Sequence, residues 1–347
     1  MRSGLFDEHF KMGARMTEAD GWDVPEVFTS FAEEYAAARA GAVIYDSSPR
    51  GRLRLTGSAR IDFLHRMSTN ELNMFGPGQG AATVLTTPIA RIIDRVVVYA
   101  RQDDALLLTS RGAQALVANW LRKYIFFNDD VQVRDASAET GLVSIYGPMS
   151  ADVVSRLVGQ DVSGLSLHAW LAHSSLTVAR ADAIAGDGFH VFAPVPAGLS
   201  AAWQAALAAG AVPIGEQALE TLRIESGLPR FARELSEAYI PLEVGLWQDV
   251  SFSKGCYIGQ EIIARMESRQ RLAKQMVGLR SDVSIESGAD IAFEGEPVGK
   301  VSSAAPRPGS DWIGLGFVKP AAATPGLRLS IGADRAAQAD VVAFPIP

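Results

Sequence analysis

The spacing of apolar residues changes near residue 275, and this change most limits what the 347-residue chain can fold into. Before it, stretches with the spacing of amphipathic helices are mixed with stretches that alternate like half-buried strands. After it, short apolar stretches are separated by Gly, Pro and Ser, which is typical of a small all-β domain. A chain of this length also exceeds what one hydrophobic core usually organises. The sequence therefore predicts an α+β region at 1–267 and a β domain at 275–347.

The α+β region is predicted from particular helix and strand patterns. Residues 26–39 have apolar side chains at helical spacing and stop at Gly41. Residues 51–57 alternate like a strand, and Ser58 is placed to cap a helix after it. Further strands are expected at 82–86, 92–99, 105–109, 131–133, 142–146, 176–179 and 189–193, and further helices at 112–124, 150–157, 197–209 and 217–226.

The C-terminal domain and its boundary are predicted from the remaining patterns. Strands are expected at 276–279, 298–301, 313–318, 327–331 and 337–342. The boundary is expected in the basic, polar segment 268–271. Since strands and helices do not alternate strictly before it, the order is that of an α+β protein rather than a doubly wound sheet.

Charge and cysteine content limit the expected binding partners and cellular compartment of the protein. The net charge of −7 argues against a surface that binds nucleic acid, because such a surface needs clustered Lys and Arg. The single cysteine excludes an internal disulfide, and residues 1–8 lack the apolar core of a signal peptide, so we expect a cytoplasmic protein. The apolar stretch 92–100 is short and carries charges, and we expect no membrane span.

Cys256 is the first candidate functional residue. Lys254 precedes it by two positions, and a helix is expected to begin near Gly259. An ammonium group and a helix N-terminus both favour the thiolate, which suits nucleophilic, redox or metal-contact chemistry. From these surroundings alone, an inert buried cysteine is the more frequent alternative. Because there is no Cys-x-x-Cys, Cys256 can supply at most one ligand or one reactive thiol.

Asp94 is the second candidate, placed between Arg91 and Arg95 where an apolar strand begins. A carboxylate held by cations stays ionised, and it can stabilise a developing positive charge or accept a hydrogen bond from a ligand amine. The alternative is a solvated turn residue. The five histidines show no metal-ligand spacing, so no metal site is predicted.

Arg223 is the third candidate, on a helical turn just before Gly227. Its guanidinium group is suited to bind a carboxylate or a pterin-like ring of a ligand. The alternative is a structural ion pair with Glu220 or Glu225.

The segment FSKGCYIGQE, residues 252–261, resembles the signature of YgfZ-type proteins, which are relatives of the glycine-cleavage T-protein, the aminomethyltransferase GcvT. Residues 40–48 and 69–72 also resemble segments of the aminomethyltransferases. Residues 222–243 resemble the part that leads into the cysteine motif, and residues 299–318 resemble the terminal β domain. The resemblance therefore covers essentially the whole chain.

The resemblance implies a three-domain, T-protein-like ring made of two intertwined ferredoxin-like α+β domains and a C-terminal β-barrel. It also implies that tetrahydrofolate, or a one-carbon derivative of it, binds in the central opening. The residues that it implies as catalytic are Cys256 and Asp94, and those that it implies as cofactor-binding are Asp94, Asp187, Arg223, Lys254 and Tyr257.

The chain departs from the aminomethyltransferase pattern at three places. Asp94 matches the catalytic aspartate, but Arg95 stands where that family has a second acid, and Ala90-Arg91 replaces a pair of glycines. Ser48-Pro49-Arg50 stands in place of Ser-His-Met, and residues 186–189 alter a Gly-Glu element. These changes weaken the transfer of a complete aminomethyl-transfer site but do not weaken folate binding.

Three functional hypotheses follow from these residues and from the resemblance. The leading one is a tetrahydrofolate-binding accessory protein that assembles or repairs iron–sulfur enzymes, its client partners, with Cys256 as the reactive residue. The second is a folate-dependent methyl- or aminomethyltransferase in which Asp94 supports the folate amine. The third is an RNA-modification partner that uses the basic stretch 265–274. Apart from an indirect tRNA-modification role, we expect no nucleic-acid partner.

Overall fold

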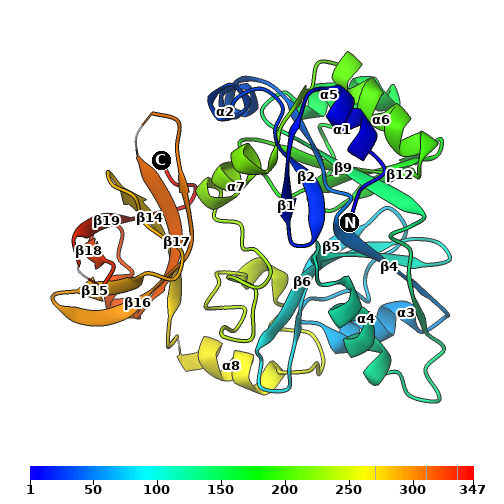
Figure 1. The fold of residues 1–347 in the computed structure, drawn as a ribbon. Coiled ribbons are helices and arrows are strands. Elements are labelled where there is room, and N and C mark those ends of the chain that lie inside the picture. The colour runs from blue at the N-terminus through cyan, green and yellow to red at the C-terminus, as the bar shows by residue number, and fades with distance from the viewer. Residues whose placement is uncertain (270, 310, 334) are drawn as a thin grey trace. The chain divides into compact units, whose positions relative to one another are not determined.

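The computed structural model describes residues 1–269, 271–309, 311–333 and 335–347 (Figure 1). Its first compact unit comprises Met1–Thr86, Ile93–Ala218 and Asp249–Ile258, and its second comprises Thr87–Ile92, Leu219–Gln248 and Gly259–Pro347. Within the described ranges, no helix is long and apolar enough to cross a membrane. The domain limits at 267 and 275 stay a prediction, and Gln270 of the expected boundary segment lies outside the described residues.

The first unit contains a five-stranded sheet with the order β5-β6-β7-β4-β8. Strand β4 is followed by a helix and by the β6–β7 pair, and a second helix leads to β8, which pairs with β4. This βαββαβ order is that of a ferredoxin-like domain. The bounds are β4 Arg50–Thr56, α3 Arg60–Met67, β5 Gly80–Thr86, β6 Ile92–Ala100, β7 Ala105–Arg111, α4 Gln114–Lys123 and β8 Gln132–Asp135.

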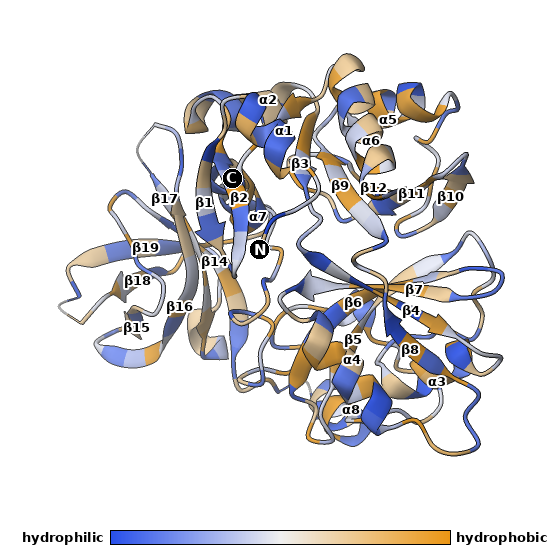
Figure 2. Cartoon of the chain, turned by 45° about the vertical axis from the view of Figure 1, so that its right-hand side comes forward, coloured by the Kyte–Doolittle hydropathy of each residue, from blue (hydrophilic) through white to orange (hydrophobic). Residues whose placement is uncertain are grey.

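A six-stranded sheet of the same unit, with the order β10-β11-β12-β9-β3-β13, repeats this plan with one insertion. Strand β3 lies between β9 and β13, antiparallel to β9 and parallel to β13. Figure 2 shows the apolar colouring of β9, whose residues are almost all buried. The bounds are β3 Val43–Asp46, β9 Thr140–Tyr146, α5 Ser150–Val158, β10 Trp170–His173, β11 Leu176–Ala181, β12 Gly188–Pro194, α6 Ala197–Ala208 and β13 Val212–Pro213.

The two ferredoxin-like domains are intertwined, as the family resemblance implies. Strands β3 and β4 are consecutive along the chain but belong to different sheets. Tyr99 of one sheet and Phe192 of the other lie edge to face, with ring centroids 5.5 Å apart, in a shared apolar cluster. Burying this cluster removes apolar surface from both sheets at once, so each domain stabilises the other.

The second unit contains the predicted β-barrel, a closed sheet with the order β14-β17-β16-β15-β18-β19. Its core includes Leu279, Ile291 and Leu329, all fully buried. The five strands expected from the sequence are present, and the short β15, which the patterns do not predict, completes the closure. The bounds are β14 Gln275–Ser281, β15 Asp290–Phe293, β16 Glu296–Pro306, β17 Trp312–Val318, β18 Arg328–Ile331 and β19 Ala337–Val342.

Two predicted details near the N-terminus are wrong. The helix expected from residue 26 is α2, Phe31–Ala40, because residues 22–27 form strand β2, which pairs with β1, Arg15–Ala19. The side chain of Ser30 caps α2 by accepting a hydrogen bond from the Glu33 N–H. Ser58 does not cap α3, since its hydroxyl donates to Asp130 Oδ2 at 2.8 Å instead.

Candidate functional site

Asp94 lies on β6 with its side chain fully buried. Its Oδ2 atom accepts a hydrogen bond from the backbone N–H of Ser110 on β7, at 2.9 Å. Its Oδ1 atom is buried and has no hydrogen-bond partner among the residues that the structure describes. Burial raises the pKa of Asp94 to about 6, against the opposing effects of the Ser110 hydrogen bonds and the Arg50 charge. Asp94 is therefore neither a solvated turn residue nor a carboxylate kept firmly ionised by its neighbours.

The cation next to Asp94 in the sequence is engaged elsewhere. Arg95 donates from Nε to Asp249 Oδ2 at 2.6 Å and binds Asp182 through two bonds of 2.8 and 3.0 Å. Burial acts to raise the pKa of Asp182, but the ion pair with Arg95 outweighs it and holds that pKa well below its usual value. Arg95 therefore ties β6 to the turn after β11 and to the segment that carries Cys256.

A directional hydrogen-bond chain runs from Arg50 on β4 into the six-stranded sheet. Arg50 Nη1 lies 3.1 Å from His190 Nε2, and because a guanidinium group can only donate, Nε2 must accept. His190 Nδ1 therefore carries the proton and donates to Ser144 Oγ at 2.9 Å, which in turn lies 2.6 Å from Ser47 Oγ. Burial, followed by the Arg50 charge, lowers the pKa of His190 well below its usual value, so the ring stays neutral.

Further polar groups of the first unit lie within the electrostatic reach of Arg50. Its charge acts on the pKa values of Asp94, Tyr99, His168 and Asp182. Tyr99 Oη and His168 Nδ1 are buried, and neither has a hydrogen-bond partner within the described part of the chain. Buried polar atoms are usually satisfied, so their concentration here points to a ligand site.

Cys256 is exposed, so the expectation of a buried cysteine is wrong. The ammonium group of Lys254 is bound to the backbone, since its three N–H groups donate to the carbonyls of His65, Ser68 and Asn70 at 2.5, 2.8 and 2.7 Å. Burial lowers the pKa of Lys254 to about 8. The lysine therefore anchors its segment to the end of α3.

The segment that carries Cys256 is held at both of its ends as well. Thr69 Oγ1 donates to the Asp249 carbonyl at 2.6 Å, and Thr86 Oγ1 donates to the Ile258 carbonyl at 2.7 Å. Tyr257 is buried beside Cys256, and burial raises its pKa to about 12. Helix α8, Gln260–Arg269, begins four residues after the cysteine, close to the predicted position. The thiol is thus presented on a firmly anchored segment.

Asp187 lies in the turn between β11 and β12 and is half-buried. Its carboxylate forms an ion pair with Arg180. Its carbonyl oxygen accepts hydrogen bonds from the Gly147 N–H at 3.0 Å and the Ser150 hydroxyl at 2.9 Å. The turn is therefore rigid, and part of the Asp187 carboxylate still faces solvent.

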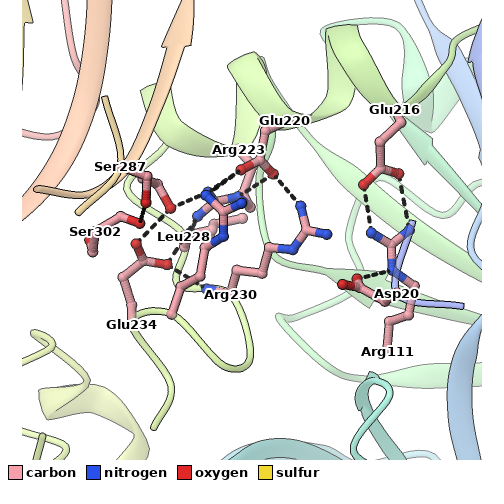
Figure 3. Close-up of polar contacts among 12 residues, drawn as sticks. Asp20, Arg111, Glu216, Glu220, Arg223, Leu228, Arg230, Glu234, Ser287 and Ser302 are labelled. Carbon is pink, nitrogen blue, oxygen red and sulfur yellow. Dashed lines mark hydrogen bonds and ion pairs between the residues drawn. The ribbon is translucent and has the colours of Figure 1, made fainter. Parts of the chain in front are cut away.

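Arg223 lies in the second unit, on helix α7, Glu216–Glu225, and it binds protein groups with all five of its N–H groups (Figure 3). Two of them donate to Glu220 at 2.9 and 2.7 Å. The other three donate to the Leu228 carbonyl at 2.6 Å, Ser303 Oγ at 2.9 Å and Glu234 at 3.4 Å. The predicted alternative of an ion pair with Glu220 is therefore present.

The first unit contains five of the six residues named from the sequence, namely Asp94, Asp187, Lys254, Cys256 and Tyr257. Sequence reasoning missed Arg50 and His190 as site residues. The signal for Arg50 was its place in the altered Ser-Pro-Arg element, whereas nothing marked His190. No group of His, Cys, Asp and Glu among the described residues could hold a metal ion.

Comparisons with known proteins agree on one family. The family described as "GCVT N-terminal domain" matches residues 5–254. A candidate chloroplastic transferase of Arabidopsis thaliana is 36% identical, over 93% of this chain and 75% of that protein. An aminomethyltransferase of Streptomyces coelicolor is 30% identical, over 96% of this chain and 93% of that protein.

A solved structure shows the same fold. The crystal structure of the glycine-cleavage aminomethyltransferase T of Bartonella henselae superposes with a TM-score of 0.90, over 99% of this chain and 97% of that one, at 20% identity. The expected α+β fold class is thereby confirmed. From the family match and the two sequence relatives, we conclude that this chain belongs to the GcvT aminomethyltransferase superfamily.

Proposed function

We propose that this protein is a tetrahydrofolate-dependent transferase of one-carbon units, aminomethyl or methyl, with Asp94 as its catalytic residue. The observation that carries the proposal is the unpartnered, buried Oδ1 atom of Asp94 on a carboxyl whose pKa is raised to about 6. A group with a pKa close to the working pH can take and return a proton. The aminomethyltransferases among the relatives support the same reaction class.

The chemistry of tetrahydrofolate matches the unpartnered oxygen of Asp94. The buried oxygen lacks a hydrogen-bond donor, and the reduced pterin ring carries several N–H groups. When bound, tetrahydrofolate supplies the amine that accepts or carries the one-carbon unit. Asp94 orients that amine, accepts its proton and stabilises positive charge that develops beside it.

The other residues named from the sequence have supporting roles in this proposal. Asp187 and Tyr257 contact the folate, since part of the Asp187 carboxylate faces solvent and Tyr257 lies on the anchored segment. Lys254 and Arg223 act through the backbone that they hold, because their N–H groups are bonded to protein acceptors. Cys256 is not required for the transfer step.

Direct titration with tetrahydrofolate tests the proposal. Under anaerobic conditions, calorimetry should give a dissociation constant between about 1 μM and 1 mM, the usual range for enzyme substrates. The Asp62→Asn variant, which changes an exposed carboxylate on α3, should bind equally well. If the wild-type protein shows no binding at millimolar tetrahydrofolate, the proposal is wrong.

A second candidate function is the accessory role in iron–sulfur enzyme assembly or repair, which is the role of a YgfZ-type branch of the superfamily. The observation in its favour is the exposed thiol of Cys256 on a segment anchored by Lys254, Thr69 and Thr86. In this role Cys256 is the reactive residue, and the bound folate assists the reaction of its thiol.

Two substitutions separate the candidates in cells that lack the endogenous protein. Under the transferase proposal, Cys256→Ala keeps function, whereas Asp94→Asn loses it. The measurements are one-carbon exchange by each purified variant and the specific activity of iron–sulfur enzymes in the cells, with blotting to show equal amounts of each variant. The opposite pattern, in which only Cys256→Ala fails, would establish the accessory role and remove the transferase proposal.

A further inference from the structure

Arg50 is a partly buried arginine without a carboxylate partner among the described residues. By contrast, Arg95 binds two carboxylates, and Arg111 binds Glu216 through two bonds of 3.0 and 2.6 Å (Figure 3). A partly desolvated cation without an anion is costly unless a ligand compensates it.

The guanidinium group of Arg50 is nevertheless held in one orientation. Its Nε atom donates to the Thr109 carbonyl at 3.2 Å, and its Nη1 atom donates to His190 Nε2 at 3.1 Å. Ser144 fixes the His190 ring from the other side at 2.9 Å. Its Nη2 atom has no hydrogen-bond partner in the ranges that the structure describes. A fixed guanidinium group with free N–H donors is a preorganised binding group.

One peptide unit sets the position of Arg50 relative to Asp94. The carbonyl oxygen of Thr109 accepts the Arg50 hydrogen bond, and the N–H of Ser110, which belongs to the same peptide group, donates to Asp94 Oδ2. A peptide group is planar and rigid, so the cation and the carboxyl flank it at a fixed separation. Each of the two side chains keeps unused hydrogen-bonding capacity, on Nη2 of Arg50 and on Oδ1 of Asp94.

We propose that Arg50 binds the carboxylate of the second reactant, a small molecule with an amino group and a carboxylate that exchanges the one-carbon unit at Asp94. This inference rests on the proposed transferase function and names the substrate class. The amino group of the reactant lies toward Asp94, and the carboxylate of the reactant accepts hydrogen bonds from the N–H groups of Arg50. Arg50 is thus the residue that selects an amino acid-like reactant over a simple amine.

The neighbouring charges favour a carboxylate over a phosphate. Asp94 and Asp182 both lie close enough for the Arg50 charge to affect their pKa values, so a dianion would meet two acids in the same place. A carboxylate carries one negative charge, and its planar shape matches the guanidinium fork. Arg50 therefore suits a monoanionic, planar group.

The experiment compares two probes that differ only in the anionic group. Glycine carries an amine and a carboxylate, and glycinamide carries an amine and a neutral amide. Saturation-transfer NMR on the full-length protein, with and without saturating tetrahydrofolate, measures both affinities in the millimolar range. We expect wild-type protein to prefer glycine by about 10-fold or more, because hydrogen bonds to charged groups are the stronger ones.

Three variants complete the design. Arg50→Met should remove the preference for glycine and leave tetrahydrofolate affinity within about 2-fold of wild type, and Arg50→Lys should keep part of the preference because it keeps the charge. The control, Arg54→Met, lies on the same strand and pairs with Asp104, and it should retain the preference. Equal affinity of wild-type protein for the two probes would overturn the proposal.

Two further outcomes separate this inference from the proposed function. If Arg50→Met leaves glycine binding intact but weakens tetrahydrofolate binding, Arg50 contacts the folate and the inference is wrong. If tetrahydrofolate does not bind at all but the glycine preference persists and depends on Arg50, the carboxylate site stands and the transferase function fails.

Discussion

Replacing Asp94 with asparagine should abolish one-carbon transfer and, at the same pH, stabilise the fold. The variant loses the carboxyl that accepts the proton of the folate amine, so kcat should fall by about 10²- to 10⁴-fold. Exchange of a ¹³C-labelled one-carbon unit between methylene-tetrahydrofolate and an added amine measures this loss. Asp62→Asn, on the exposed face of α3, serves as the matched control.

The gain in stability has a defined pH dependence. The pKa of Asp94 is about 6 in the folded protein, above its value of about 3.9 in an unfolded chain, so folding favours the protonated form. The free energy of unfolding therefore decreases as the pH rises from about 4 to about 6, by on the order of 3 kcal/mol for this fully buried group. Urea unfolding at pH 4.5 and pH 8 should show that Asp94→Asn gains stability mainly at pH 8. An equal effect at both pH values would contradict the assignment of this pKa.

Replacing Arg95 with methionine should cost about 3 to 5 kcal/mol of stability, the usual effect of breaking a buried ion pair from one side. The change leaves Asp182 and Asp249 without their shared cation in a mostly buried setting. Arg134→Met, which breaks an exposed pair with Glu139, should cost less than about 1 kcal/mol.

The stability lost in Arg95→Met should depend on pH in the opposite sense to the stability contributed by Asp94. Arg95 holds the pKa of Asp182 below its unfolded value, so the contribution of the pair is present above about pH 4 and is lost as the pH falls. The difference between wild type and Arg95→Met should therefore be largest near pH 7 and shrink toward pH 3. Urea titrations across this range measure it, and a constant difference would show that lost packing, not charge, is responsible.

Most helices and strands could be predicted because their signals are local. Strand β16 alternates between buried and partly exposed positions along its second half, and β17, β6 and β7 are mostly buried stretches of ordinary strand length. Strand β15 has only four residues, with two of them buried, which is too short for a pattern to be recognised. The placement of β3 between β9 and β13 depends on pairing across distant parts of the chain, which no local spacing records.

The candidate site was less predictable, because its residues meet from far along the chain. The partners of Arg95 lie 87 and 154 positions away, and the residues whose carbonyls bind Lys254 lie up to 189 positions away. The flanking arginines of Asp94 suggested an ionised carboxylate, but its pKa is decided by burial within the sheet. Local spacing could single out Asp94, Cys256 and Lys254 as candidates. It could not show which protein groups bind the charged side chains around them.

The insertion of β3 also bears on how the protein folds during synthesis. The ribosome makes β3 before every strand that pairs with it, since Val43 pairs with Tyr146 and with Val212. Residues 50–135 supply all strands of the five-stranded sheet and can pair earlier. Because domains made first usually fold first, we expect β3 to stay unpaired until β9 has emerged at about residue 146, and one of its edges to stay open until about residue 212 has emerged. Strand β3 is thus made early but fully paired late, and we expect chaperones to bind it until its pairing is complete.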